Sequence, residues 1–192
     1  MKKNNKKAVV CSQSAVIHIY TGDGKGKTTA SLGLALRAIG ANKKVLIIQF
    51  MKKPDFSEHE AIKKYNLPIE IESYGIGFYH ILGDGHTDQE HKNACQRALE
   101  RAREALEEQK YDLIILDEIN VALGFNLIKL NDILNILTPK AHLVGGTKVT
   151  DVVLTGRKAH PKLIELADLV TEMKEIKHYF NNGLEARKGI EY

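Results

Sequence analysis

Residues 17–40 read IHIYTGDGKGKTTASLGLALRAIG, and this stretch decides the fold. It joins a short β-branched run to a glycine-rich segment and then to a helical pattern. The usual phosphate-binding loop has the pattern G-x-x-x-x-G-K-[ST]. Gly26, Lys27 and Thr28 match the end of that pattern, whereas Gly22 stands one position later than its first glycine. The question is therefore whether this shortened loop still binds a triphosphate.

A loop between a strand and a helix start suits phosphate, because free N–H groups and the positive end of the helix dipole point at the ligand. The glycines let the backbone approach oxygen atoms closely, Lys27 supplies positive charge, and the Thr28 hydroxyl can reach Mg²⁺. The alternative, a merely flexible turn, fits poorly with the intact GKTT sequence. The predicted nucleotide-binding residues of the loop are Gly22, Asp23, Gly24, Lys25, Gly26, Lys27, Thr28 and Thr29.

Two later strand ends carry polar residues that can complete such a site. In LIILDE, an apolar run delivers Asp117 and Glu118 to the C-terminal edge of the sheet, where either can bind Mg²⁺ directly or through water. Either residue can instead cap the next helix. In LTGR, Arg157 follows a strand end and can contact a triphosphate, and the alternative is a surface salt bridge.

The whole chain alternates strand and helix patterns. Strands are predicted at 15–20, 43–50, 68–74, 111–118, 151–157 and 168–173, and helices at 27–40, 57–65, 87–110, 131–137 and 161–167. This alternation predicts an α/β fold, a P-loop NTPase-like (RecA-like) three-layer sandwich with a mainly parallel sheet. We expect a basic, flexible arm over residues 1–15 and one domain over residues 16–192.

Two pairs, Ser57 with Glu60 and Thr87 with Glu90, have the spacing of capping boxes at helix starts. The second opens a long helix whose stripe of small residues allows close packing on a sheet or on a partner chain. This stripe contains Ala94, Ala98, Ala102 and Ala105.

Composition excludes several classes of protein. No apolar run approaches the ~20 residues of a membrane helix, and we read no signal peptide, so we expect a cytoplasmic protein without a membrane partner. The two cysteines, Cys11 and Cys95, are expected to be reduced thiols. Four of the 28 basic residues fall in the first seven positions, and the other 24 balance 24 acidic residues, which argues against nucleic-acid binding. The histidines and aspartates of HILGDGHTDQEH, residues 80–91, are not expected to form a metal site.

The loop, the LDE strand and the C-terminal third together resemble the corrinoid adenosyltransferases of the CobA/CobO/BtuR type. That family has a loop like GNGKGKTT, which is GDGKGKTT here, and strands like VVLDE and VVLTGR. These are followed by a His, a stretch like LADLVTEM, a KH pair and an end like GIEY. The corresponding segments are Ile114–Glu118, Val152–Arg157, His160, Leu166–Met173, Lys177–His178 and Gly189–Tyr192. The resemblance runs from about Ile17 to the last residue.

The resemblance implies a reaction at C5′ of ATP rather than at the γ-phosphate. The nucleotide is held in a reversed pose, cobalt(I) of a corrinoid attacks C5′, and the whole triphosphate leaves. The residues expected to stabilise that leaving group are Lys27, Thr28 with Mg²⁺, Glu118 and the backbone N–H groups of residues 22–27. Arg37 matches a family arginine that contacts the nucleotide. The resemblance also implies a homodimer and a flavin-type reductase that supplies cobalt(I).

The sequence departs from the family on the corrinoid side. The family has a GFTW-like loop whose Phe and Trp pack on the lower face of cobalt, and here Phe78 is kept but His80 replaces the Trp. An imidazole at this position can ligate cobalt, stack or point away, and Phe78 can also simply anchor its loop. Two other functions remain open at this point. One is a P-loop ATPase or kinase acting at the γ-phosphate, and the other is a non-catalytic module that binds ATP or nucleic acid.

Overall fold

The sheet of this protein is built around the strand that leads into the glycine-rich loop. A computed structural model describes residues 15–77, 79, 84–138, 144–145 and 148–192. Its main sheet has six strands in the order β3-β2-β4-β7-β1-β8, and all the pairings are parallel. The strands are β1 Ile17–Thr21, β2 Val45–Gln49, β3 Ile69–Ser73, β4 Leu113–Asp117, β7 Asp151–Thr155 and β8 Leu169–Glu172. Two short strands, β5 Val144–Gly145 and β6 Lys148–Val149, pair antiparallel.

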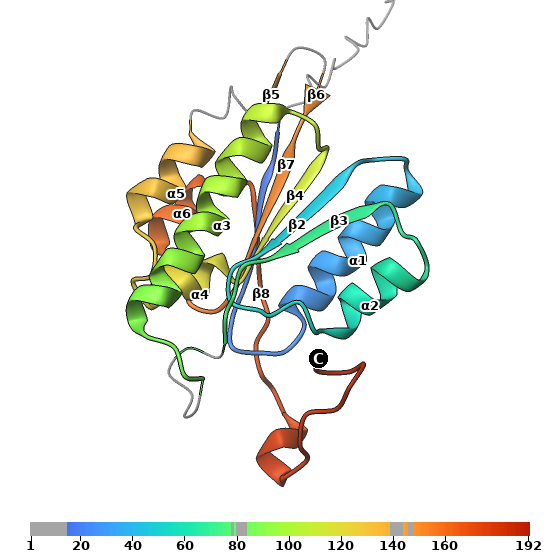
Figure 1. The fold of residues 1–192 in the computed structure, drawn as a ribbon, viewed down its shortest axis with the longest axis vertical. Helices are drawn as coiled ribbons and strands as arrows, with labels where there is room; N and C mark the ends of the chain where they lie inside the picture. Colours follow the sequence, from blue (N-terminus) through green and yellow to red (C-terminus); the bar gives the residue numbers. More distant parts are fainter. Residues whose placement is uncertain (1–14, 78, 80–83, 139–143, 146–147) are drawn as a thin grey trace, which may run out of the picture.

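Helices cover both faces of this sheet, so the predicted three-layer α/β architecture is confirmed (Figure 1). One face carries α1 Lys27–Gly40 and α2 Ser57–Lys64, and the other carries α3 Asp88–Glu108, α4 Ile119–Gly124, α5 Leu130–Leu137 and α6 Pro161–Leu166. A 3₁₀ helix spans Tyr179–Asn182 near the C-terminus. None of the described helices is long and apolar enough to cross a membrane.

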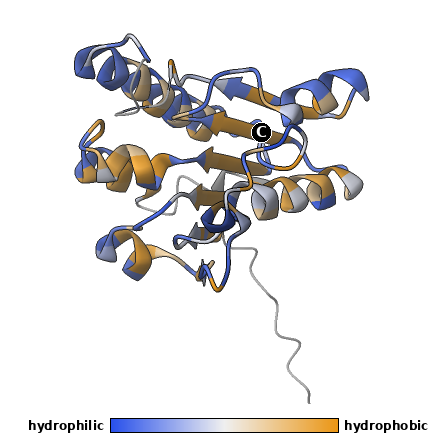
Figure 2. Ribbon diagram, turned by 90° about the horizontal axis from the view of Figure 1, so that it is seen from below, coloured by the Kyte–Doolittle hydropathy of each residue, from blue (hydrophilic) through white to orange (hydrophobic). Residues whose placement is uncertain are grey.

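Continuous apolar strands form because both faces of the sheet are buried. Successive residues of β2 alternate between two core clusters: Leu46 and Ile48 pack with α3 and α5, whereas Val45 and Ile47 pack with α1. Figure 2 shows the hydrophobic strands enclosed between the two helix layers. The core also includes Ala15, which is 3% exposed.

The alanine stripe of α3 faces inward. Ala94, Ala98, Ala102 and Ala105 are at most 1% exposed and belong to the cores of the described chain. Of the two alternatives left by the sequence, packing on the sheet is therefore the one found, and the stripe supplies no surface for a partner chain.

One of the two predicted capping boxes is confirmed and the other is wrong. Thr87 Oγ1 accepts from the Glu90 N–H, and the Glu90 carboxylate accepts from the Thr87 N–H at 2.7 Å. At α2 the N-cap is Phe56, so Ser57 is already the first helical residue. Its Oγ instead donates to the Tyr192 carbonyl at 2.8 Å, which is a contact that no local pattern could show.

The buried thiol of Cys95 gives a first test of this packing. Cys95 is 1% exposed on the inner face of α3, and burial raises its pKa to about 12. Because the thiolate is the reactive form, a Cys11→Ser variant should not react with Ellman's reagent at pH 8 in native buffer and should react with one equivalent in denaturant. Rapid labelling of the native variant would contradict the burial of this helix face.

Candidate active site

A cleft opens at the C-terminal edge of the sheet, where parallel α/β sheets hold their ligands. Its volume is about 690 Å³. The glycine-rich loop forms its floor, the start of α2 forms one wall, and the last residues of the chain form another. Figure 1 shows the C-terminus beside α2, at the end of the molecule where the loop lies. The lining includes the predicted residues Asp23, Gly24, Lys25, Gly26, Lys27, Thr28, Thr29, Glu118 and Arg157.

The glycine-rich loop has the backbone geometry of an anion cradle. Gly22 and Gly26 have φ values of 98° and 121°, which favour glycine. Gly26 is the N-cap of α1, and no side chain caps that helix end. The N-terminus of α1 therefore faces the cleft with its dipole and N–H groups available to a ligand.

The loop is also pressed against the end of β8. The Gly24 N–H donates to the Met173 carbonyl at 2.7 Å, and the Met173 N–H donates to the Thr21 carbonyl at 2.8 Å. A Cβ on Gly24 would lie 2.7 Å from that Met173 oxygen and 2.9 Å from the Lys174 carbonyl carbon. Gly24 is thus required by a close backbone approach, and the C-terminal third of the chain fixes the shape of the loop.

Lys27 turns back into its own loop. Its Nζ donates to the Gly22 carbonyl at 2.7 Å and to the Gly24 carbonyl at 2.8 Å, and the residue is 7% exposed. Burial lowers the pKa of this ammonium, and the nearby Glu118 opposes the shift. A lysine held by two carbonyl groups in the floor of a cleft is placed to exchange them for phosphate oxygens.

Asp117 ends β4 and is completely buried. Its Oδ1 accepts from Thr28 Oγ1 at 2.9 Å and from Thr155 Oγ1 at 2.7 Å. Thr155 can reach because β7 lies between β4 and β1 in the sheet, and the same hydroxyl accepts from the Glu118 N–H at 2.9 Å. The strand order thus joins the predicted carboxylate to the predicted threonine.

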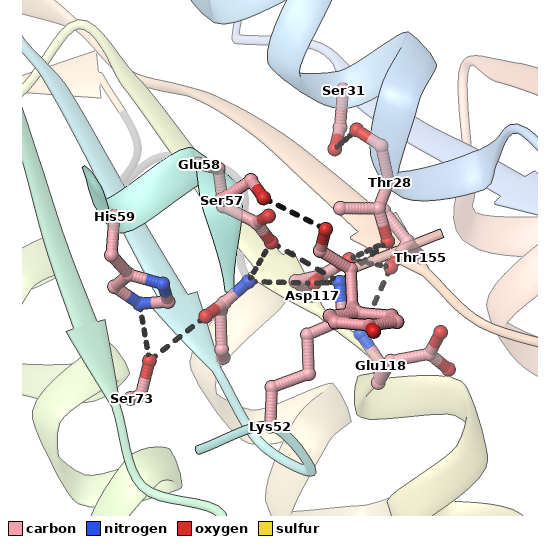
Figure 3. Close-up of polar contacts among 12 residues, drawn as sticks. Thr28, Ser31, Lys52, Ser57, Glu58, His59, Ser73, Asp117, Glu118 and Thr155 are labelled. Atoms are coloured by element: carbon pink, nitrogen blue, oxygen red, sulfur yellow. Dashed lines mark hydrogen bonds and ion pairs between the residues drawn. The ribbon is translucent and has the colours of Figure 1, made fainter. Parts of the chain in front are cut away.

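A second set of polar residues, which the sequence analysis missed, surrounds the other oxygen of Asp117 (Figure 3). Gln49 Nε2 donates to Asp117 Oδ2 at 3.2 Å and to Glu58 Oε1 at 3.1 Å, while Ser73 Oγ donates to Gln49 Oε1 at 2.8 Å. The ammonium of Lys52 lies 2.9 Å from Asp117 Oδ2. Gln49 ends an apolar strand next to β4, a position that in retrospect marks it for the site.

Glu118 is half-buried and has a strained backbone. It is the N-cap of α4 in the left-handed region, with φ of 64°, and its side chain makes no capping hydrogen bond. Such backbone strain in a residue other than glycine often accompanies function. Burial and the adjacent Asp117 raise the pKa of Glu118, although Lys52, Lys27 and Arg157 act in the opposite direction. The carboxyl group therefore faces the cleft and does not serve the helix.

One predicted residue that the structure describes lies away from the site. Arg37 is exposed in the last turn of α1, near Tyr20, and does not line the cleft. Phe78 and His80 lie outside the described residues. Their assignments to the nucleotide and the corrinoid stay predictions.

The C-terminal segment closes one side of the cleft. Lys25 Nζ donates to the Ile190 carbonyl and lies 3.4 Å from Glu191 Oε1. Lys188 pairs with Glu60 of α2 at 2.9 Å. These contacts join residues 128 to 166 positions apart, so the sequence could predict this segment only as irregular.

The histidine-rich stretch after β3 holds a local contact between an imidazole and a carboxylate. His91 Nε2 lies 2.9 Å from Asp84 Oδ2, and the described residues contain no group of three or more potential ligands that could hold a metal ion. The residues at the end of β4 fit Mg²⁺ better, because the Thr28 hydroxyl and the Asp117 carboxylate converge within 2.9 Å and hard oxygen donors are what this ion prefers.

Comparison with known proteins agrees with this geometry. Residues 13–192 match the family model described as ATP:corrinoid adenosyltransferase BtuR/CobO/CobP. A corrinoid adenosyltransferase of Sinorhizobium sp. is 35% identical over 193 residues, which cover 96% of this chain and 84% of that protein. One of Pseudomonas aeruginosa is 34% identical over 203 residues, covering 100% and 94%. One of Escherichia coli K12 is 30% identical over 182 residues, covering 94% and 87%.

Replacing Gly24 tests the contact between the loop and β8. Gly24→Ala should lower the midpoint of thermal unfolding, because overpacking costs about 1–3 kcal/mol, and should weaken binding of Mg-ATP by about tenfold or more in calorimetric titration. Gly33→Ala is the matched control, since a Cβ there has no atom within 4 Å and alanine favours the helix by about 0.5–1 kcal/mol. Equal ATP affinity in both variants would contradict the proposed close approach.

Proposed function

Because this chain belongs to the ATP:corrinoid adenosyltransferase family, we propose that its cleft is the active site for transfer of the adenosyl group of ATP to a corrinoid. The chain is therefore an enzyme, a transferase that takes ATP and a corrinoid as substrates. The observation that carries the proposal is the joining of Lys27 and Thr28 of the loop with Asp117 and Glu118 at one sheet edge.

The proposed reaction breaks the bond between C5′ and its oxygen. Two electrons of cobalt(I) form the new bond between cobalt and carbon, and the triphosphate leaves with the electron pair of the broken bond. No proton transfer to or from the attacking atom is needed. The contribution of the protein is therefore electrostatic stabilisation of a highly charged leaving group, together with alignment of C5′.

We assign the triphosphate to the loop. The N–H groups of residues 22–27, apart from that of Gly24, which donates to the Met173 carbonyl, and the N-terminus of α1 would donate to its oxygens, with Lys27 exchanging its carbonyl partners for phosphate. Arg157 lines the same cleft and supplies a second cation. The apolar side chains of the lining offer a surface for the nucleoside, and they include Leu32, Leu36, Phe56, Ile62 and Leu67.

We further propose that Thr28 and Asp117 hold Mg²⁺, with Glu118 contributing through water. When bound there, Mg²⁺ supplies positive charge to the triphosphate. Thr155 and Gln49 would keep the Asp117 carboxylate oriented, because each donates to one of its two oxygens.

The partners of the enzyme remain proposals that rest on the family resemblance. We propose a homodimer in the cytoplasm and a flavin-type reductase that delivers cobalt(I). For the corrinoid, we propose that Phe78 packs on the lower face of cobalt and that His80, in the position of the family Trp, changes the details of that contact. The alternative of a P-loop ATPase or kinase acting at the γ-phosphate is not favoured by the relatives.

Products distinguish this proposal from an ATPase or kinase. Under anaerobic conditions, the protein, Mg-ATP and chemically reduced cobalamin should yield inorganic triphosphate and a light-sensitive alkyl-cobalt spectrum. Lys27→Ala should lower the rate by about 100-fold or more, because it removes a charge at the leaving group. Lys63→Ala, an exposed change on α2, is the control and should be unaffected. Phosphate or ADP with cobalt left unalkylated would sink the proposal.

The role of Phe78 has its own test. Phe78→Ala should slow adenosylation of cobalamin because an aromatic group packed on cobalt is lost, while the affinity for Mg-ATP, measured by calorimetry, should stay the same. Unchanged adenosylation would show that Phe78 serves only its loop.

A further inference from the structure

The corner between Thr28 and Asp117 already contains a cation. Lys52 Nζ lies 2.9 Å from Asp117 Oδ2 and donates to Thr28 Oγ1 at 3.1 Å (Figure 3). Lys52 follows β2, outside the phosphate loop, and its side chain is 16% exposed. The ammonium therefore sits between the two side chains to which we assign Mg²⁺.

The position has a clear electrostatic cause. Asp117 is completely buried, and a buried carboxylate is costly unless it is paired. Thr28, Thr155 and Gln49 give it only neutral hydrogen bonds. The Nζ of Lys27 donates instead to the Gly22 and Gly24 carbonyls, so Lys27 acts on Asp117 electrostatically without a direct contact. In the part of the chain that the structure describes, Lys52 makes the ion pair recorded for Asp117.

We propose that Lys52 is a resident countercation of the empty site, which must withdraw from Thr28 and Asp117 before Mg²⁺ can bind there with ATP. This inference rests on the proposed function, because it takes Thr28 and Asp117 as the residues that hold the ion. The Lys52 ammonium and a divalent ion compete for the same two oxygens. The site therefore excludes the metal until another negative group accepts the Lys52 ammonium.

The Lys52 side chain has alternative contacts within the cleft. Glu58 Oε1 lies 3.6 Å from its Nζ, and the Phe56 ring centroid lies 5.3 Å away. Lys52 also lines both the cleft and a neighbouring cavity of about 320 Å³. A short rotation of a flexible lysine stem would break the contact with Asp117 and keep the one with Glu58.

This arrangement makes metal and nucleotide binding depend on each other. The triphosphate brings negative charge that can receive the displaced ammonium, whereas Mg²⁺ alone brings none. We therefore expect the nucleotide-free enzyme to bind a divalent ion weakly, and we expect removal of the Lys52 charge to relieve that weakness. Lys52 is a positioning residue in this scheme.

The first test uses Mn²⁺ alone as the probe. Free Mn²⁺ is titrated with nucleotide-free protein and followed by electron paramagnetic resonance. Lys52→Met should bind Mn²⁺ about tenfold or more tightly than the wild type, a change equal to ~1.4 kcal/mol of lost competition. Lys53→Met, which alters an exposed neighbour, should bind as the wild type does. Equal affinity in all three proteins would overturn the proposal.

A second measurement on the wild type covers the case in which Lys52→Met does not fold. The ammonium signal of Lys52 is followed by ¹⁵N NMR of lysine side chains and assigned with Lys52→Arg. It should shift when Mg²⁺ is added with a non-hydrolysable ATP analogue and stay in place with Mg²⁺ alone. A signal that does not respond to Mg²⁺ with the analogue would overturn the proposal.

A titration of the wild type with the ATP analogue, with and without Mn²⁺, separates this inference from the proposed function. If Mn²⁺ fails to strengthen binding of the analogue to the wild type, the assignment of the metal site itself is wrong. If the metal strengthens nucleotide binding but Lys52→Met and the wild type bind Mn²⁺ alone equally, only the role of Lys52 falls.

Discussion

The buried carboxylate of Asp117 is the constraint around which the site is organised. Removing an ionised group from water costs several kcal/mol, so the fold must supply donors and an opposite charge. Those donors come from three separate parts of the chain: Thr28 follows the loop, Thr155 ends β7, and Gln49 ends β2. The strand order β2-β4-β7-β1 is what brings them to one carboxylate. The strand order of the sheet therefore determines which side chains surround the Asp117 carboxylate.

The parts of this arrangement that could be predicted from the sequence are those carried by contiguous residues. The glycine-rich loop, the LDE strand end and the apolar strands each have a local pattern, and the α/β fold and the placement of Lys27, Thr28 and Glu118 in one cleft followed from them. Lys52 and Glu58 have no such pattern, because their role depends on which strand lies beside β4. The wrong capping box at Ser57 has the same origin, since a partner 135 residues away takes its hydroxyl.

Hydrolysis of ATP and alkylation by ATP need the same groups in the phosphate loop but different groups around it. Both need a cradle of N–H groups, a lysine and a cation. An ATPase must also place and activate water at the γ-phosphate, whereas alkyl transfer at C5′ needs the triphosphate only as a good leaving group. A cleft whose described charged groups gather around the phosphate loop is consistent with the second demand. In the scheme proposed for Lys52, its ammonium group occupies the position of Mg²⁺ until the nucleotide binds.

The contact of Gly24 with Met173 has a consequence for the order in which the enzyme is made. The loop lies near the start of the chain, yet β1 is flanked by β7 and β8, and the last residues bond to Lys25 and Ser57. Contacts between residues so far apart form slowly, and a growing chain emerges from its N-terminus. A nascent chain thus carries the whole phosphate motif long before it has a nucleotide site. The described cleft therefore takes its shape only after β8 and residues 173–192 have joined the loop and the start of α2.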